Sequence, residues 1–171
     1  VYVIPGSGPD PTWGRAAFAA AFAIDFLYEA YYDPQFDSKK TDIYNKVVSL
    51  ADWVLTQQCT DNLKKAYGGF KSNETSTYYY SVDVCRVIPS LLKAYELTND
   101  TNYLDAAKLA GATFLKTMQD KQTYGGFARA VTIDDAWLLQ MDIECLYGLI
   151  GLKMLAEKHD VANASLYESI M

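Results

Sequence analysis

The tetrapeptide Tyr-Gly-Gly-Phe occurs twice, in "NLKKAYGGFKSNE" at Tyr67–Phe70 and again in "DKQTYGGFARAVT" at Tyr124–Phe127. Glycine pairs adopt backbone angles that other residues avoid, so each copy predicts a sharp turn. The segments before the two turns, "ADWVLTQQ" (51–58) and "GATFLKTMQ" (111–119), also match. Each runs from a small residue through an aromatic and an aliphatic residue to a glutamine. Internal similarity of this kind indicates a repeat architecture.

Hydrophobic periodicity distinguishes two kinds of helix around these turns. From Asp42 to Gln57 the apolar side chains form one stripe opposite a polar face, and Tyr103 to Met118 repeats this pattern. By contrast, 15–31 and 135–156 are apolar on nearly every side, so we expect other helices to cover them completely. Inner helices should therefore alternate with amphipathic outer helices. The predicted helices lie near 11–32, 41–59, 77–97, 101–119, 133–158 and 162–171.

Composition supports a packed globular chain. Half of the 171 residues are hydrophobic and only 21% are charged, which suits a single domain spanning 1–171. The repeats would lie near 11–70, 71–127 and 128–171. A net charge of -6 argues against nucleic acid, because phosphate binding needs clustered lysine and arginine. The longest apolar run, Ala16–Ile24, is too short to span a bilayer.

Three sequons predict N-glycosylation at Asn73, Asn99 and Asn163, each in an expected loop or helix start. They favour an extracellular or cell-surface protein, although ordinary helix capping accounts for the same residues equally well. The chain begins at Val1 without a signal peptide, so we expect it to be a processed chain or a fragment of a longer one.

The repeated segments resemble the QW motif of terpenoid cyclases. Gly111, Phe114-Leu115, Gln119 and Gly125-Gly126-Phe127 carry the resemblance, and Ala51, Trp53-Val54, Gln58 and Gly68-Gly69-Phe70 form a looser copy. The chain thus resembles the α/α-toroid (six-hairpin barrel) proteins, which include terpenoid cyclases, protein prenyltransferases and many sugar-cleaving enzymes. The resemblance implies alternating inner and outer helices, with ligands bound where the inner helices begin. It also implies about twelve helices in a complete ring, so this chain forms an incomplete toroid of about six.

Three segments lead into the expected inner helices: 6–15, 72–86 and 128–144. If those helices run parallel, the segments converge at one end, where aromatic rings would lie beside charged groups. Rings cover the apolar faces of sugars, and carboxylates bind hydroxyl groups, so this composition favours carbohydrate. The candidate substrate-binding residues are Trp13, Arg15, Tyr78, Tyr80, Asp83, Arg86, Arg129 and Trp137.

The candidate catalytic acids are Asp134, Asp135 and Asp142, in "TIDDAWLLQMD". On a helix, Asp135 and Asp142 would face the same way two turns apart, roughly 10 Å along the axis, which suits an acid and a base separated by water. A structural interpretation remains open, in which Asp134 or Asp135 caps a helix and Asp142 makes a buried hydrogen bond. "TIDD" is similar to the acid motif of proton-initiated terpenoid cyclases, but Thr132 replaces its first aspartate, which disfavours cyclisation.

Other chemistries have little support. His159 is the only histidine and lies at an expected helix end, and the three cysteines are far apart, so we predict no metal and no cofactor. The leading hypothesis is a carbohydrate-active domain, a glycoside hydrolase or polysaccharide lyase, whose partner is a glycan. The rival is a non-catalytic structural, self-assembling or interaction protein. Half a ring favours this rival, because its open edges need a homo-oligomer or the rest of a longer chain.

Overall fold

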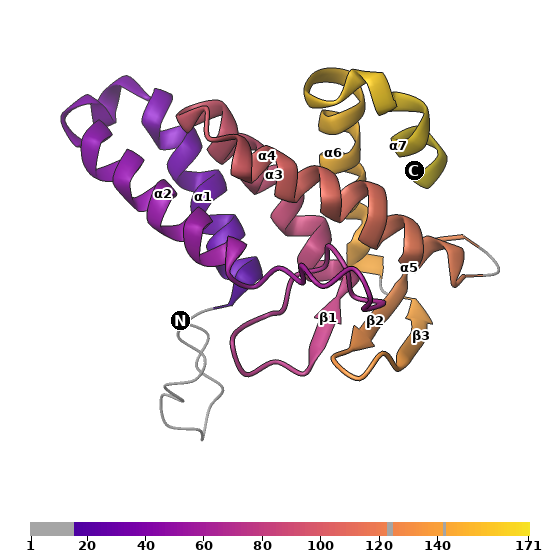
Figure 1. The fold of residues 1–171 in the computed structure, drawn as a ribbon. Helices are drawn as coiled ribbons and strands as arrows, with labels where there is room; N and C mark the ends of the chain where they lie inside the picture. Colours follow the sequence, from indigo (N-terminus) through magenta and orange to yellow (C-terminus); the bar gives the residue numbers. More distant parts are fainter. Residues whose placement is uncertain (1–15, 123–124, 142) are drawn as a thin grey trace.

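The computed structural model describes residues 16–122, 125–141 and 143–171, which are mostly helical, as predicted (Figure 1). None of the helices among these residues is long and apolar enough to cross a membrane. The elements, in chain order, are α1 (Ala17–Tyr32), η2 (Pro34–Lys39), α2 (Lys40–Leu55), β1 (Tyr78–Tyr80), α3 (Ser81–Thr98), α4 (Thr101–Leu109), η3 (Ala110–Leu115), α5 (Lys116–Asp120), β2 (Ala128–Thr132), β3 (Trp137–Met141), η4 (Ile143–Leu146), α6 (Tyr147–Met154), η5 (Leu155–His159), η6 (Val161–Asn163) and α7 (Ala164–Ile170).

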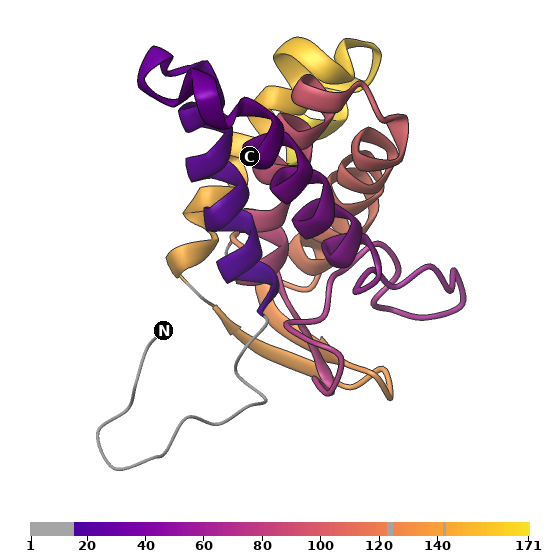
Figure 2. The same ribbon diagram turned by 90° about the vertical axis from the view of Figure 1, so that its left-hand side faces the viewer.

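Helices α1, α3 and α6 lie side by side, with α3 packed between the other two. We call them the α1–α3–α6 layer. Helix α2 packs against α1, α4 packs against α3, and α7 packs against η5; Figure 2 shows α2 and α4 on one side of the layer. Helix α6 approaches α3 closely at Gly151, where an added Cβ would stand 2.7 Å from Ile88 Cγ2. The described chain therefore forms three hairpins, each with one helix in the layer.

The glycines of the first Tyr-Gly-Gly-Phe turn are buried, whereas Gly125 and Gly126 of the second are exposed. Gly68 has φ +85°, and an added Cβ would stand 2.8 Å from the Leu109 carbonyl oxygen. Gly125 has φ +86°, with no atom within 4 Å of its added Cβ. Both positions need the left-handed backbone that glycine adopts without steric cost. The predicted turn is confirmed at these glycines, in two different surroundings.

The two repeated glutamines join neighbouring hairpins. Gln58 Nε2 donates to the carbonyl oxygens of Gly68 (3.1 Å) and Ala106 (3.0 Å), linking the end of the first hairpin to α4. Gln119 Nε2 donates to the carbonyl oxygen of Ile170 at 2.9 Å, at the end of α7. Each glutamine thus binds the backbone of the next hairpin, which explains why it recurs with the turn.

Glu96, near the end of α3, joins three elements. It accepts hydrogen bonds from Tyr28 Oη of α1 (2.5 Å) and Lys158 Nζ of η5 (2.6 Å), and His159 Nε2 lies 2.8 Å from Oε1. Burial alone would raise the pKa of Glu96, but the hydrogen bonds from Lys158, Tyr28 and His159 outweigh it and lower the pKa below 4.5. We call these four residues the Glu96 cluster.

Two predicted helix starts are wrong, because the chain forms strands there. Tyr78–Tyr80 is strand β1 rather than the first turn of α3, and residues 128–141 form the β2–β3 hairpin rather than the first half of a helix over 133–158. The sheet order is β1-β2-β3, and both pairs are antiparallel. Tyrosines and β-branched residues such as Val131, Thr132 and Ile133 are common in strands, but the local pattern does not exclude a helix start, and long-range contacts decide the outcome.

The expectation that the inner helices are covered on every side is also wrong. Phe26 of α1 is 68% exposed, and Leu146, just before α6, is 64% exposed. Phe18 and Phe22 of α1, and Tyr147 and Ile150 of α6, are also exposed. In the described chain, one face of the α1–α3–α6 layer therefore presents large apolar side chains to solvent.

Candidate functional site

A shallow hollow lies on the exposed face of the α1–α3–α6 layer. Its volume is about 160 Å³, and all three helices of the layer contribute to its walls. The second layer of helices contributes no residue to them. The lining residues are Ala21, Phe22, Asp25, Arg86, Pro89, Lys93, Tyr147, Ile150 and Met154.

Arg86 lies among aromatic rings at one end of the hollow. The guanidinium carbon is 5.2 Å from the ring centre of Phe22, 5.6 Å from that of Tyr147 and 5.8 Å from that of Phe18. A cation near ring faces at these distances is attracted by their quadrupoles. Phe18 and Phe22 lie in the first half of α1, and Tyr147 begins α6. Arg86, a candidate from the sequence, thus lies beside the first half of α1 and the start of α6.

Asp25 provides a carboxylate in the hollow. Its Oδ1 accepts a hydrogen bond from Ser90 Oγ at 3.0 Å and lies 3.6 Å from Lys93 Nζ. Burial raises the pKa of Asp25, and the nearby Lys93 and the Ser90 hydrogen bond oppose that rise. Lys93 also pairs with Glu29 at 3.2 Å. The hollow therefore combines aromatic rings, two cations and a carboxylate that is protonated more readily than usual.

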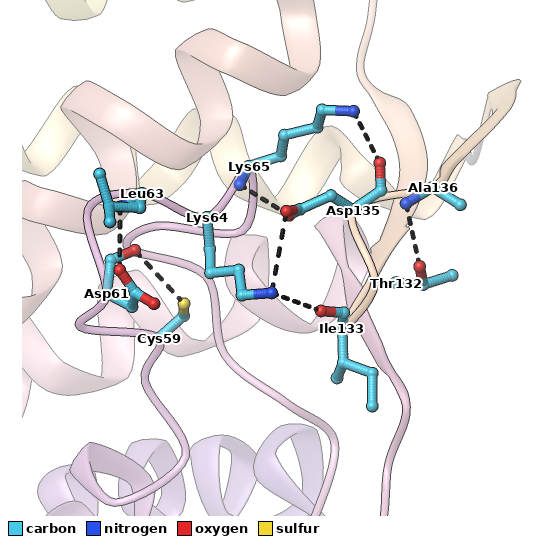
Figure 3. Close-up of polar contacts among 9 residues, drawn as sticks. All are labelled: Cys59, Asp61, Leu63, Lys64, Lys65, Thr132, Ile133, Asp135 and Ala136. Atoms are coloured by element: carbon cyan, nitrogen blue, oxygen red, sulfur yellow. Dashed lines mark hydrogen bonds and ion pairs between the residues drawn. The ribbon is translucent and has the colours of Figure 1, made fainter.

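Asp135 lies in the turn of the β2–β3 hairpin, not on a helix. Its φ is +62°, and its Oδ1 accepts a hydrogen bond from the Lys65 backbone N–H at 2.9 Å (Figure 3). Lys65 Nζ donates to the Asp135 carbonyl oxygen at 2.8 Å, and Lys64 Nζ donates to that of Ile133 at 3.3 Å. The helical spacing assumed for Asp135 and Asp142 is therefore wrong. These contacts favour a structural role in holding the hairpin against residues 64–65.

Replacing Asp135 with alanine should lower the free energy of unfolding by about 1–2 kcal/mol, because alanine is strained at positive φ and cannot accept the Lys65 hydrogen bond. Asparagine tolerates this backbone and retains an acceptor, so Asp135→Asn should cost less than about 0.5 kcal/mol. Urea unfolding at pH 7 measures both. Equal losses in the two variants would show that the carboxylate charge, rather than backbone and acceptor, holds the turn.

The remaining described candidates lie on or beside the small sheet. Tyr78 and Tyr80 stack on one side of β1, with ring centres 5.4 Å apart. Trp137 begins β3, and its ring lies 5.6 Å from Lys65 Nζ and 5.2 Å from Lys121 Nζ. Asp83 is buried and accepts a hydrogen bond from Ser72 Oγ. Arg129 on β2 and Asp134 in the turn are exposed.

Trp13, Arg15, Asp142 and the predicted helix start at residue 11 lie outside the described residues. Of the described candidates, the hollow contains Arg86 alone. Sequence reasoning missed Phe22, Asp25, Lys93 and Tyr147 as site residues. The available signal was the spacing of Phe18, Phe22 and Phe26 at intervals of four along an alanine-rich helix, which places three large rings on one face.

The part of the chain that the structure describes contains no group of three or more histidine, cysteine and acidic side chains able to hold a metal ion. Cys59, Cys85 and Cys145 are buried free thiols.

The chain matches no protein-family model, and no curated protein has a significantly similar sequence.

Proposed function

We propose that this chain forms part of an α/α toroid and binds a glycan in the hollow of the α1–α3–α6 layer. Three observations support the toroid: three helices lie side by side in the layer, a second layer covers one side, and equivalent glutamines link successive hairpins. Such helical repeats stack into curved arrays whose concave surface binds ligands.

The observation that carries the glycan proposal is the combination of rings and hydrogen-bonding groups in one hollow. Phe22 and Tyr147 offer apolar surface beside Arg86, and Asp25 lies next to Lys93. A sugar presents apolar C–H faces bordered by hydroxyl groups, so rings and charged groups bind different parts of it. We therefore propose a saccharide rather than a purely apolar ligand as the occupant.

If the domain is also an enzyme, a glycoside hydrolase or lyase, Asp25 is the described residue best placed to act as an acid. Its raised pKa favours the protonated form that a general acid needs. Glycoside hydrolysis commonly uses two carboxyl groups, and Asp142 stays the sequence-predicted candidate for the second. Asp135 is a weaker candidate, because its carboxylate holds the hairpin turn.

Calorimetric titration with a panel of gluco-, manno-, galacto- and uronate oligosaccharides tests the binding proposal. Tyr147→Ala should weaken binding about tenfold, because the ring would lose its stacking contact with the sugar. Tyr32→Ala is the matched control, since Tyr32 is 55% exposed, Tyr147 is 48% exposed, and Tyr32 does not line the hollow. Absence of binding by the whole panel at millimolar concentration, or equal loss in both variants, would contradict the proposal.

A second candidate function is a non-catalytic assembly or interaction domain. The exposed rings of Phe18, Phe22 and Phe26 on α1 support it, because a contiguous exposed apolar face marks an interaction surface.

We also propose an extracellular or cell-surface location with N-glycans. Asn99 and Asn163 are exposed, and Asn73 is half-buried in a turn with Thr75. Mass spectrometry before and after glycosidase treatment tests the glycans.

A further inference from the structure

Both edges of the α1–α3–α6 layer are apolar on the exposed face. Helix α3 lies between α1 and α6, so in the described structure α1 and α6 each have one side without a layer neighbour. Phe26 is exposed on α1, and Leu146 of η4 and Ile150 of α6 are exposed on the opposite side of the layer. We call these the α1 edge and the α6 edge. Each exposes large side chains that would gain stability from burial against another helix.

The two edges also complement each other in charge. Helix α1 contains the acids Asp25 and Glu29 and no lysine or arginine, whereas α6 contains Lys153 and no acidic residue. Glu29 and Lys153 also lie at similar heights along the layer. Glu29 contacts Lys93 at 3.2 Å, and Lys93 and Met154, which follows Lys153, both line the hollow. An α1 edge placed parallel to an α6 edge would therefore bring Glu29 towards Lys153.

The hollow is small for a binding site formed by one chain. At about 160 Å³ it is roughly half the lower end of the range of about 300–1,000 Å³ that is usual for small-molecule pockets. Its lining residues come from three helices only, and nothing in the described chain covers it from the opposite side. A surface that faced it would enlarge the site and exclude water from it.

We propose that the occupant of this face is a second copy of the chain. Two copies, related by a twofold axis parallel to the layer helices, place the α1 edge of each against the α6 edge of the other. The two contacts are identical, all six layer helices remain parallel, and the ring closes with the two hollows facing each other. Closed twofold assemblies of this kind are the commonest oligomers. The dimer does not depend on whether the hollow binds a glycan.

Sedimentation equilibrium and light scattering from about 1 to 200 μM test the dimer. The expected mass is twice the chain mass of 19.1 kDa. Phe26→Asp on the α1 edge and Leu146→Asp on the α6 edge should each weaken association at least 100-fold. Both side chains are exposed in the single chain, so circular dichroism should show folded variants. Leu63→Asp is the control, because Leu63 is exposed on a loop away from the layer, and it should leave the mass unchanged.

Charge reversal tests which edges meet. Glu29→Lys and Lys153→Glu should each weaken the dimer several-fold, and the double variant should restore the original affinity, because the pair then forms with opposite orientation. Within one chain Glu29 contacts Lys93 at 3.2 Å and Lys153 contacts Glu157 at 3.7 Å, so the thermal stability of each single variant is measured at a concentration where the protein is monomeric.

Three results would overturn the proposal. These are a single-chain mass up to 200 μM, a dimer that is insensitive to both edge variants, and long polymers in place of a closed pair. A longer native polypeptide whose own further helices cover the face would also overturn it, and crosslinking would detect this. Saccharide titration of the wild type separates the two proposals. A dimer that binds no saccharide would support the closed ring and contradict the glycan function. A monomer that binds a saccharide would support the glycan function and contradict the dimer.

Discussion

Gly68→Ala is expected to lower the free energy of unfolding by about 2–5 kcal/mol, whereas Gly125→Ala should cost only about 1–2 kcal/mol. The two glycines occupy the same position of the repeated turn, with φ +85° and +86°. The cost of placing alanine in this left-handed conformation is therefore the same for both. Gly68 carries an additional cost, because its new Cβ would stand 2.8 Å from the Leu109 carbonyl oxygen, and backbone displacement of this kind costs about 1–3 kcal/mol more.

Chemical denaturation of the two variants measures this difference directly. The cost of the left-handed backbone is the same in both variants and cancels in the comparison. The additional loss in free energy of unfolding in Gly68→Ala therefore reports the packing of the turn against α4. Equal losses would mean that the first turn is not packed against α4 in solution. Gly69→Ala tests the packing of the same turn against η3, since an added Cβ there would stand 2.6 Å from ring atoms of the buried Phe114.

Glu96→Gln is expected to lower the free energy of unfolding at pH 7 by about 2–4 kcal/mol. The carboxylate accepts hydrogen bonds from Tyr28 and Lys158 and contacts His159, and hydrogen bonds to charged groups contribute about 1.5–3 kcal/mol each. Glutamine retains one acceptor oxygen but loses the charge that Lys158 contacts. Glu157→Gln is the matched control, because Glu157 is exposed and forms an ion pair with the exposed Lys153, so less than about 0.5 kcal/mol should be lost.

The same variant should alter the dependence of stability on pH. The pKa of Glu96 in the folded chain is below its ordinary value of 4.5, so folding favours the ionised form. Its stabilisation is therefore complete above the unfolded pKa and is lost as the pH falls through the folded pKa. Unfolding measured from pH 7 to pH 3 should show a difference between wild type and Glu96→Gln that shrinks below about pH 4.5. A difference that is constant over this range would contradict the assignment.

Subtracting the pH profile of the free energy of unfolding of Glu96→Gln from that of the wild type also removes the contribution of Asp25, which both proteins contain. Burial raises the pKa of Asp25, so its contribution to stability has the opposite dependence on pH. This contribution is present at low pH and is lost as the pH rises through the pKa of Asp25 in the folded chain. The raw pH profile of the wild type therefore combines two opposing groups. The difference profile therefore reports Glu96 together with the residues that contact it.

The hairpins could be predicted from sequence because their signals are local. The stripe of apolar residues over 42–57 and the second stripe over 103–118 correspond to α2 and to the run α4–η3–α5. The β2–β3 hairpin could not be predicted this way. Its run from Val131 to Met141 is apolar with two aspartates in the middle, and a helix start and a hairpin turn are equally compatible with that composition. Only the contact of Asp135 with Lys65, far away in sequence, distinguishes them.

The hollow was harder to predict than the fold. Arg86 was identified because it lies at the start of an inner helix, but Phe22, Asp25 and Tyr147 belong to helices that are apolar on nearly every side. For such a helix the sequence does not show which face lacks a neighbour, because the pattern of apolar residues is almost uniform. Which face of α1 or α6 is exposed depends on which other helices pack around it, and the sequence of one helix does not contain that information.

The glutamine links have a consequence for how this architecture can change over generations. Gln58 and Gln119 each donate to main-chain carbonyl oxygens, of Ala106 and Ile170, rather than to particular side chains. Every residue type offers such an oxygen, so a neighbouring hairpin satisfies the glutamine whatever its own sequence. Gene duplication can therefore add a hairpin, and mutation can then diversify it freely, while the donor side of each junction stays recognisable.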